Sequence, residues 1–113
     1  MNRRPLVECL SPTERQAVCN ALRAAVEGDF FPEWEFSILI GATREEVRGI
    51  LSSWPHQPVD DEVFSSAIMG VLGNLVGYPH GREDELARYV AGGKTELKRI
   101  ILKLNSFGYV VFG

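Results

Sequence analysis

Two stretches of the sequence place a histidine close to a cluster of carboxylates. Residues 54–62 read WPHQPVDDE and residues 78–85 read YPHGREDE, so each passes from an aromatic residue through Pro-His to acids. Histidine and carboxylate side chains can move protons in general acid–base catalysis or bind a metal ion such as zinc. A paired catalytic or metal site built on His56 and His80 is therefore the first hypothesis to weigh.

The positions of the two histidines favour a structural role instead. Each follows a proline that should end a helix, where an imidazole can donate to the last free carbonyls and complement the helix dipole. A shared metal site would need both loops at one end of the molecule, whereas consecutive antiparallel helices place their C-termini at opposite ends. We expect no metal site and no cofactor, with His56 and His80 finishing helix ends.

The rest of the sequence contains no recognised catalytic signature. It has no nucleophile elbow, phosphate-binding loop, metalloprotease helix or deaminase motif. Cys9 and Cys19 do not combine with the two histidines in a zinc-binding spacing, and we expect both thiols to be reduced and structural. The sequence therefore predicts a protein that is not an enzyme.

Length and composition predict one globular domain covering residues 1–113. The chain has 45% hydrophobic and 24% charged residues, and it is long enough to bury one core without a metal or disulfide bonds. No apolar run approaches the roughly 20 residues that a membrane-spanning helix needs. The stretch MNRRPLVECLSPTER lacks the apolar core of a signal peptide, so a cytoplasmic location is expected.

Capping signals and apolar spacing predict a bundle of five to six helices. SPTE at 11–14 and TREE at 43–46 are capping boxes, in which a hydroxyl and a glutamate three residues later satisfy free backbone N–H groups. The expected helices, with their caps and stops, cover residues 11–28, 34–40, 43–54, 60–77, 82–91 and 94–106. The closing FGYVVFG is either a short strand or an apolar tail, and the fold class is a compact all-α single domain.

The helix capped by Asp60 should be the central one. Its apolar residues occur in adjacent pairs that recur every four positions, from residues 63–64 to residues 75–76, which makes it the most apolar predicted helix. It also contains Gly70 and Gly73, and an interior glycine costs up to about 1 kcal/mol relative to alanine. We therefore expect either a close crossing by another helix or a surface that a second molecule approaches.

Residues 36–51, FSILIGATREEVRGIL, contain two short helical patterns joined by a glycine turn. The pattern has a small residue in the first helix, an apolar residue before the turn, a capping threonine and two buried positions in the second helix: Ser37, Ile40, Gly41, Thr43, Val47 and Ile50. The segment resembles the helix-turn-helix motif of DNA-binding proteins. That resemblance implies that the second helix enters the major groove. DNA readout would then map onto Arg44, Glu45 and Arg48, with phosphate contacts from Lys98, Arg99 and Lys103.

The charge distribution favours a different partner. Residues 27–62 carry nine acids against two arginines, whereas DNA affinity depends largely on neutralising phosphates with lysine and arginine. Ile38 and Leu39 are apolar where the motif is normally polar. Glu45 and Glu46 place two negative charges at the front of the helix that would read DNA. DNA binding is therefore the alternative, and a basic protein is the expected partner.

Acidic clusters at 60–62 and 83–85 open two of the predicted helices. The helix dipole stabilises each carboxylate there by about 0.3–1 kcal/mol, which explains solvated acids at a helix start. Three acids at each start exceed the need of a cap, so an acidic face for a partner is the other explanation. The segment DFFPEWEF at 29–36 has four aromatic residues, and core filling is the leading interpretation. Not all four can point inward from a tight linker, which leaves one or two for the surface, and interface contacts are the other interpretation of those.

Together these patterns predict a small non-enzymatic protein-binding module with an acidic face. The expected contacts to a basic protein are Asp60, Asp61, Glu62, Glu45, Glu46 and Trp34. A concrete form is a bacterial immunity or antitoxin-type protein that neutralises a nucleic-acid-cleaving toxin, because small size and acidity suit that role. The alternative is a helix-turn-helix transcriptional regulator that uses Arg44, Arg48, Lys98, Arg99 and Lys103.

Overall fold

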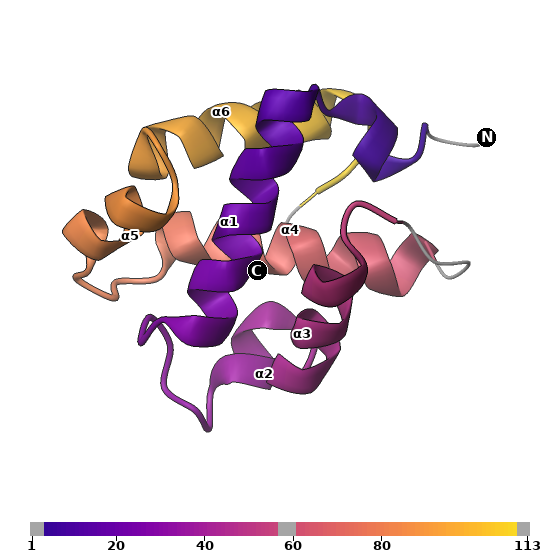
Figure 1. Ribbon diagram of the computed structural model, residues 1–113. Helices are drawn as coiled ribbons and strands as arrows, with labels where there is room; N and C mark the ends of the chain where they lie inside the picture. Colours follow the sequence, from indigo (N-terminus) through magenta and orange to yellow (C-terminus); the bar gives the residue numbers. More distant parts are fainter. Residues whose placement is uncertain (1–3, 57–60, 111–113) are drawn as a thin grey trace.

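Helix α4 (Asp61–Gly77) runs through the middle of the molecule in this computed structural model, and most of the other helices pack against it (Figure 1). The structure describes residues 4–56 and 61–110. Its elements are a 3-10 helix η1 (Leu6–Cys9) and helices α1 (Pro12–Glu27), α2 (Phe36–Ile40), α3 (Arg44–Ser53), α4, α5 (Glu83–Tyr89) and α6 (Gly93–Ser106). The described residues form no strand, and the prediction of a compact all-α domain is confirmed.

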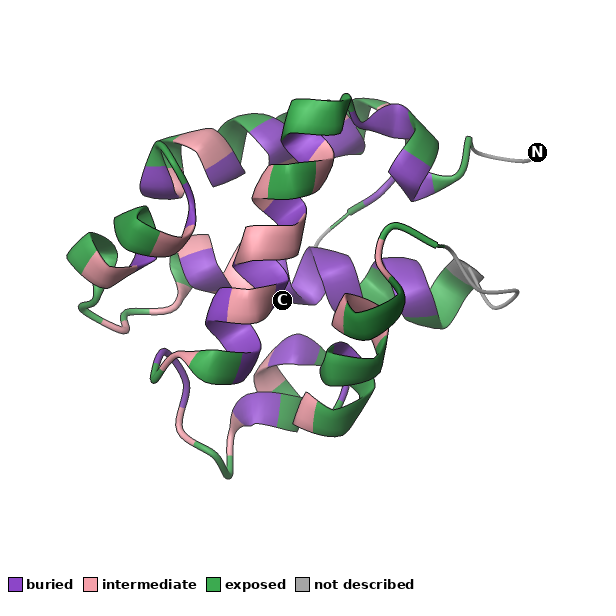
Figure 2. Cartoon of the chain, in the orientation of Figure 1, coloured by how far each residue is buried: buried purple, intermediate pink, exposed green. Residues whose placement is uncertain are grey.

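The central position of α4 follows from its apolar side chains. Phe64, Ile68, Leu72 and Leu75 are almost completely buried, and α1, α2, α3 and α6 all contact the helix. Buried positions also form the inward faces of the surrounding helices (Figure 2). Burying a side chain of this size contributes about 1.5–3 kcal/mol, so this set of contacts determines how the helices assemble.

The two predicted capping boxes are confirmed. Ser11 Oγ accepts a hydrogen bond from the Glu14 N–H at 3.2 Å, and Glu14 Oε1 accepts one from the Ser11 N–H at 2.8 Å. At the start of α3, Thr43 Oγ1 accepts from the Glu46 N–H at 3.1 Å, and Glu46 Oε1 accepts from the Thr43 N–H at 2.8 Å. Both helices therefore begin where local sequence satisfies the free backbone N–H groups.

Helices α2 and α3 are joined by a tight turn that also lies against α4. Gly41 ends α2 in the left-handed conformation with φ of 83°. A Cβ atom at Gly70 of α4 would collide with the carbonyl oxygen of Ile40, so these backbones need the glycine to approach each other. Asn74 Nδ2 donates to the Leu39 carbonyl oxygen at 2.7 Å and closes the same contact. The expected close helix crossing is confirmed at Gly70.

The ends of the described chain meet at Tyr109. Its side chain is buried, and its hydroxyl donates to the Arg4 carbonyl oxygen at 2.7 Å. Residues 107–110 therefore form an ordered tail, not a strand, while residues 111–113 lie outside the described residues. No pattern in the sequence predicted η1, whose short turn buries Leu6 and Cys9.

Candidate partner-binding surface

His80 completes the C-terminal end of α4, as predicted. The Arg82 N–H donates to His80 Nδ1 at 2.9 Å, which makes Nε2 the protonated nitrogen that donates to the Leu75 carbonyl oxygen, also at 2.9 Å. The imidazole meets the Phe30 ring edge-on at 5.0 Å between ring centroids. Among the described residues, no group of three His, Cys, Asp or Glu side chains could hold a metal ion.

The aromatic residue before each helix-ending proline packs inward. The Trp54 ring stacks on Phe64 of α4 at 6.2 Å between centroids, and its Nε1 donates to the Arg15 carbonyl oxygen at 3.0 Å. Tyr78 donates from its hydroxyl to Glu35 Oε2 at 3.1 Å. Partial burial and this hydrogen bond raise the pKa of Tyr78. These contacts connect Trp54 and Tyr78 to the fold. His56 is exposed, and its side chain makes no hydrogen bond with a described residue, so the prediction that it finishes a helix end is wrong for His56.

The aromatic linker between α1 and α2 divides into buried and exposed residues. Phe30, Phe31 and Phe36 are almost completely buried, while Trp34 is 74% exposed. The prediction that one or two aromatic residues of this linker remain on the surface is confirmed. Ile38, in the first turn of α2, is 77% exposed, so a second large apolar side chain faces solvent four residues later.

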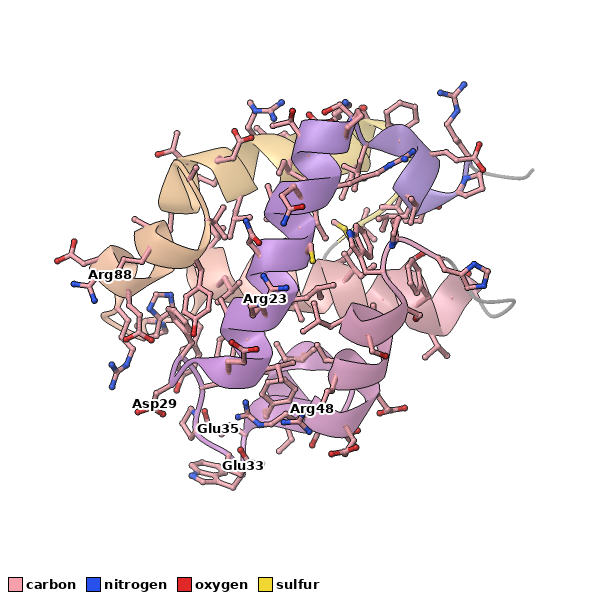
Figure 3. All side chains as sticks on the ribbon, viewed as in Figure 1. Arg23, Asp29, Glu33, Glu35, Arg48 and Arg88 are labelled. Carbon is pink, nitrogen blue, oxygen red and sulfur yellow. The ribbon has the colours of Figure 1, made fainter. Side chains whose placement is uncertain are left out.

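Carboxylates accompany these two apolar residues at the α2–α3 end of the molecule. We call the set Glu33, Trp34, Ile38, Glu45 and Glu46 the acidic tip. Figure 3 shows Glu33 and Glu35 at this end, with Arg48 of α3 nearby. The Arg44 guanidinium bonds Glu33 Oε2 from Nε at 3.0 Å and from Nη2 at 2.8 Å, which fastens the linker to the first turn of α3. The tip therefore combines two segments held together by one arginine.

Arg44 is a structural residue at the base of the acidic tip. Its Nη1 donates to the carbonyl oxygens of Ala25 and Val26 at 3.0 and 2.7 Å, which satisfies two free acceptors at the C-terminal end of α1. The guanidinium also lies over the Phe36 ring at 4.5 Å from the centroid. Only 19% of its side chain is exposed, so this proposed DNA contact is already engaged in the fold.

Tertiary contacts reduce the acidity that the sequence window of residues 27–62 indicates. Arg82, from outside the window, bonds Asp29 at 3.2 Å, and Arg23 lies 4.0 Å from Glu27. Inside the window, Arg48 pairs with Glu45 at 2.7 Å. Such exposed pairs contribute at most about 1 kcal/mol each, so their carboxylates remain available to compete for another cation.

The remaining predicted acidic contacts lie at the start of α4. Glu62 is exposed in its first turn. Asp60 and the side chain of Asp61 lie outside the part of the chain that the structure describes. Glu45 and Glu46, by contrast, are both exposed on α3, where Glu46 also closes the capping box.

The basic residues of the DNA-binding alternative do not form one surface. Helix α6, which carries Lys98, Arg99 and Lys103, lies on the opposite side of the molecule from α3, which carries Arg44 and Arg48 (Figure 1). Two of the α6 cations also have partners. Lys103 Nζ lies 2.6 Å from Glu14 Oε1, and Arg99 Nη1 lies 3.0 Å from Glu14 Oε2, while Lys98 is exposed. DNA contacts from α3 and α6 together would need a ligand that reaches around the molecule.

A groove between α3 and α4 is the feature that sequence reasoning missed. It has a volume of about 350 Å³ and is lined by Ala42, Glu46, Gly49, Ile50, Ser53, Val63, Phe64 and Ala67. One signal was present in the sequence, because Gly49 interrupts α3 where no turn or helix end requires a glycine. The groove lies directly beside the acidic tip, since Glu46 belongs to both.

Comparisons with known proteins do not assign a family. No family model matches the sequence, and neither the curated proteins nor the solved structures contain a significant match. Within the described residues, every helix is too short or too polar to cross a membrane. The functional proposal therefore depends on the chemistry of the described surface.

Proposed function

We propose that this protein is a small non-enzymatic binding module whose acidic tip docks on a basic protein. The observation that carries the proposal is the exposure of Trp34 and Ile38, at 74% and 77%, next to carboxylates on a rigid base. Exposed aromatic residues within a charged surface are typical of interface hot spots. Burying these two side chains in a partner would remove apolar surface from water, which is the main favourable term in most protein–protein association.

Rigidity supports this role because a fixed surface loses little conformational entropy on binding. Helix α2 is held to α4 by the close approach of Ile40 to Gly70 and by the hydrogen bond from Asn74 to Leu39. Arg44 holds Glu33 against α3. The backbone that carries the contact residues is therefore held in place before a partner arrives, which reduces the free-energy cost of association.

Charge supports a basic partner of the toxin-neutralising kind. Glu33 and Glu45 have side chains that are 78% and 85% exposed, and their carboxylates can steer a positively charged surface towards the tip. An enzyme that cleaves nucleic acid carries such a surface in the cleft that binds phosphates. Occupying that cleft with an acidic tip would inhibit it without any chemistry, as a bacterial immunity or antitoxin-type protein would.

Capture of partner proteins from the source cells, followed by mass spectrometry, tests the proposal. Trp34→Ser and Glu45→Lys should each weaken capture of a basic protein about tenfold or more. Matched controls lie elsewhere on the surface: Leu102→Ser removes another exposed apolar side chain from α6, and Asp84→Lys makes the same charge change on α5. Equal losses from the tip variants and the controls would contradict the proposal, as would a captured partner without a basic surface.

The DNA-binding alternative is supported by one feature, the pair α2–α3 joined by the Gly41 turn and capped by Thr43. If α3 reads DNA, random duplex DNA at low salt should bind with an affinity that falls steeply as salt rises. Arg48→Ala should then weaken binding and reduce its salt dependence. Absence of salt-sensitive binding would exclude this alternative.

A further inference from the structure

We infer that the groove between α3 and α4 receives the apolar side chains of a short basic amphipathic helix presented by the partner. The inference rests on the proposed function, because it names the element of the basic partner that this side of the module recognises. A groove between two helices is a common seat for such a helix, whose apolar residues at helical spacing act as anchors.

The walls of the groove are apolar. Val63 is 53% exposed, Ile50 is half-buried, and Phe64 and Ala67 lie beneath them in the core. Helix α3 buries only Val47 completely, so its side facing the groove keeps apolar surface in contact with water. A partner that covered this surface would complete the packing that α3 and α4 leave open.

Gly49 widens the groove without being needed by the fold. A Cβ atom at this position would meet no atom within 4 Å, and the residue has no positive φ. An interior helical glycine lowers stability relative to alanine. The glycine therefore gives α3 nothing that alanine would not give, while its missing side chain leaves space in the groove.

Charge selects a basic occupant over a neutral or acidic one. Glu46 is the charged residue among the described groove-lining residues, and no lysine or arginine is among them. Its Oε1 accepts from the Thr43 N–H, and no hydrogen bond from a described residue reaches Oε2. The α3 wall thus places an acid where a lysine or arginine flanking an apolar anchor would meet it.

The dimensions fit about two turns of helix. The α3 wall extends from Glu46 to Ser53, and the seven steps of 1.5 Å between these residues give a length of about 10 Å. The volume of about 350 Å³ is at the small end of ligand pockets, which suits one or two anchoring side chains. A pair of leucines three or four residues apart on a partner helix would lie on one face over this length.

Amide NMR shifts measured during a peptide titration test the inference. The probe is a synthetic amphipathic peptide of about 14 residues with leucines on one face and lysines on the other, which is long enough to form helix on binding. We expect shifts confined to residues 42–53 and 62–67, and at least about tenfold weaker binding to Gly49→Leu, whose side chain fills the groove. Gly77→Leu is the matched control, since Gly77 also lacks a positive φ and has open space at its Cβ position.

The charge requirement has its own variant and its own peptide. Glu46→Gln keeps the capping box, because glutamine can make the same hydrogen bond to Thr43, but it removes the negative charge. The variant should bind the lysine peptide several-fold more weakly than the unaltered protein does. A peptide with glutamates in place of the lysines should bind the unaltered protein more weakly still. Equal binding of the two peptides would overturn the basic occupant and indicate a groove for any apolar ligand. Concentration-dependent shifts at the groove without peptide would overturn it in favour of a second copy of this chain.

Failure of this inference can be distinguished from failure of the proposed function. In the capture experiment, both Gly49→Leu and Trp34→Ser should fail to capture the partner if the groove receives a partner helix. If Gly49→Leu still captured the partner while Trp34→Ser did not, the groove would be excluded as a binding site and the acidic tip would remain the proposed one. Retention by both variants would contradict the proposed function itself.

Discussion

The acidic tip and the contact between α1 and α6 use carboxylates in opposite ways. Between α1 and α6, Glu14 is 5% exposed and binds both Lys103 and Arg99. In the tip, the Glu33 and Glu45 side chains are mostly exposed, and each pairs with one arginine at the surface. The first arrangement joins two helices that are far apart in sequence, while the second leaves negative charge where another molecule can reach it.

The difference follows from desolvation. A buried carboxylate must be compensated by cations and hydrogen bonds, and removing its partners is expensive. An exposed pair gains little over hydration and is screened by salt. Charge at the α1–α6 contact therefore contributes to the fold, whereas charge at the tip remains available for binding.

The largest effect should come from Glu14→Ala. The change removes the acceptor shared by Lys103 and Arg99 as well as half of the Ser11 capping box, so we expect a loss of about 3–4 kcal/mol in the free energy of unfolding. Urea denaturation followed by circular dichroism measures it. Glu45→Ala, which removes an exposed pair with Arg48, should cost no more than about 1 kcal/mol. Similar losses from the two variants would erase the contrast between the regions.

Acid below about pH 4.5 should weaken the α1–α6 contact. Burial opposes ionisation of Glu14, but hydrogen bonds from Lys103, the Ser11 N–H and Arg99 outweigh it and lower the pKa from 4.5 to about 2. Because the pKa is lowered in the folded state, the stabilisation is complete above pH 4.5 and is lost as the pH falls to about 2. Protonation of Glu14 should lower the free energy of unfolding by at most about 3 kcal/mol.

Stability curves measured between neutral pH and pH 2 check this dependence against Glu14→Gln. The glutamine keeps the capping hydrogen bond but does not titrate, so the difference in stability between the two proteins should shrink as the pH falls. A constant difference across this range would show that the Glu14 charge does not stabilise the α1–α6 contact.

A smaller and opposite effect is expected on the groove side of the tip. Gly49→Ala should raise the free energy of unfolding by about 0.5–1 kcal/mol, because the added Cβ has open space and favours helix. Thermal unfolding measures the gain. The contrasting control is Gly70→Ala, whose Cβ would collide with Ile40 and should lower stability. A loss of stability in Gly49→Ala would contradict the conclusion that the fold does not need this glycine.

The smallest change should come from the tip itself. Trp34→Ser removes a side chain that is mostly exposed to water, so the free energy of unfolding should change by less than about 0.5 kcal/mol. Equilibrium unfolding in urea tests this expectation on the variant that should lose partner capture. A large loss of stability would make Trp34 a structural residue and remove the contrast with Glu14.

Local sequence signals predicted the helices well because their physical causes are local. Each capping box joins residues three positions apart, and its hydrogen bonds form wherever the sequence places them. The burial of α4 followed from apolar residues on nearly all its sides, and Gly70 marked the close crossing. By contrast, η1 has no capping signal, so burial of its residues against the tertiary core determines it.

The candidate site was predictable only in part. Exposure of one linker aromatic followed from counting four of them in eight residues, although only the structure identifies Trp34 and adds Ile38. Arg44 looked like a contact to DNA, yet it bonds the end of α1 eighteen and nineteen residues earlier in the chain. No pattern of neighbouring residues contains such a contact, because the partner atoms are backbone carbonyls.

The sequence by itself determined where helices begin, which helix is central and that the middle of the chain is rich in acids. Only the tertiary structure decided which acids are neutralised, since Arg82 reaches Asp29 and Lys103 reaches Glu14 across long stretches of chain. It also decided that α3 and α4 leave a groove open beside Gly49. Caps and periodicity act over a few residues, whereas ion pairs and grooves depend on distances that exist only after the helices have packed.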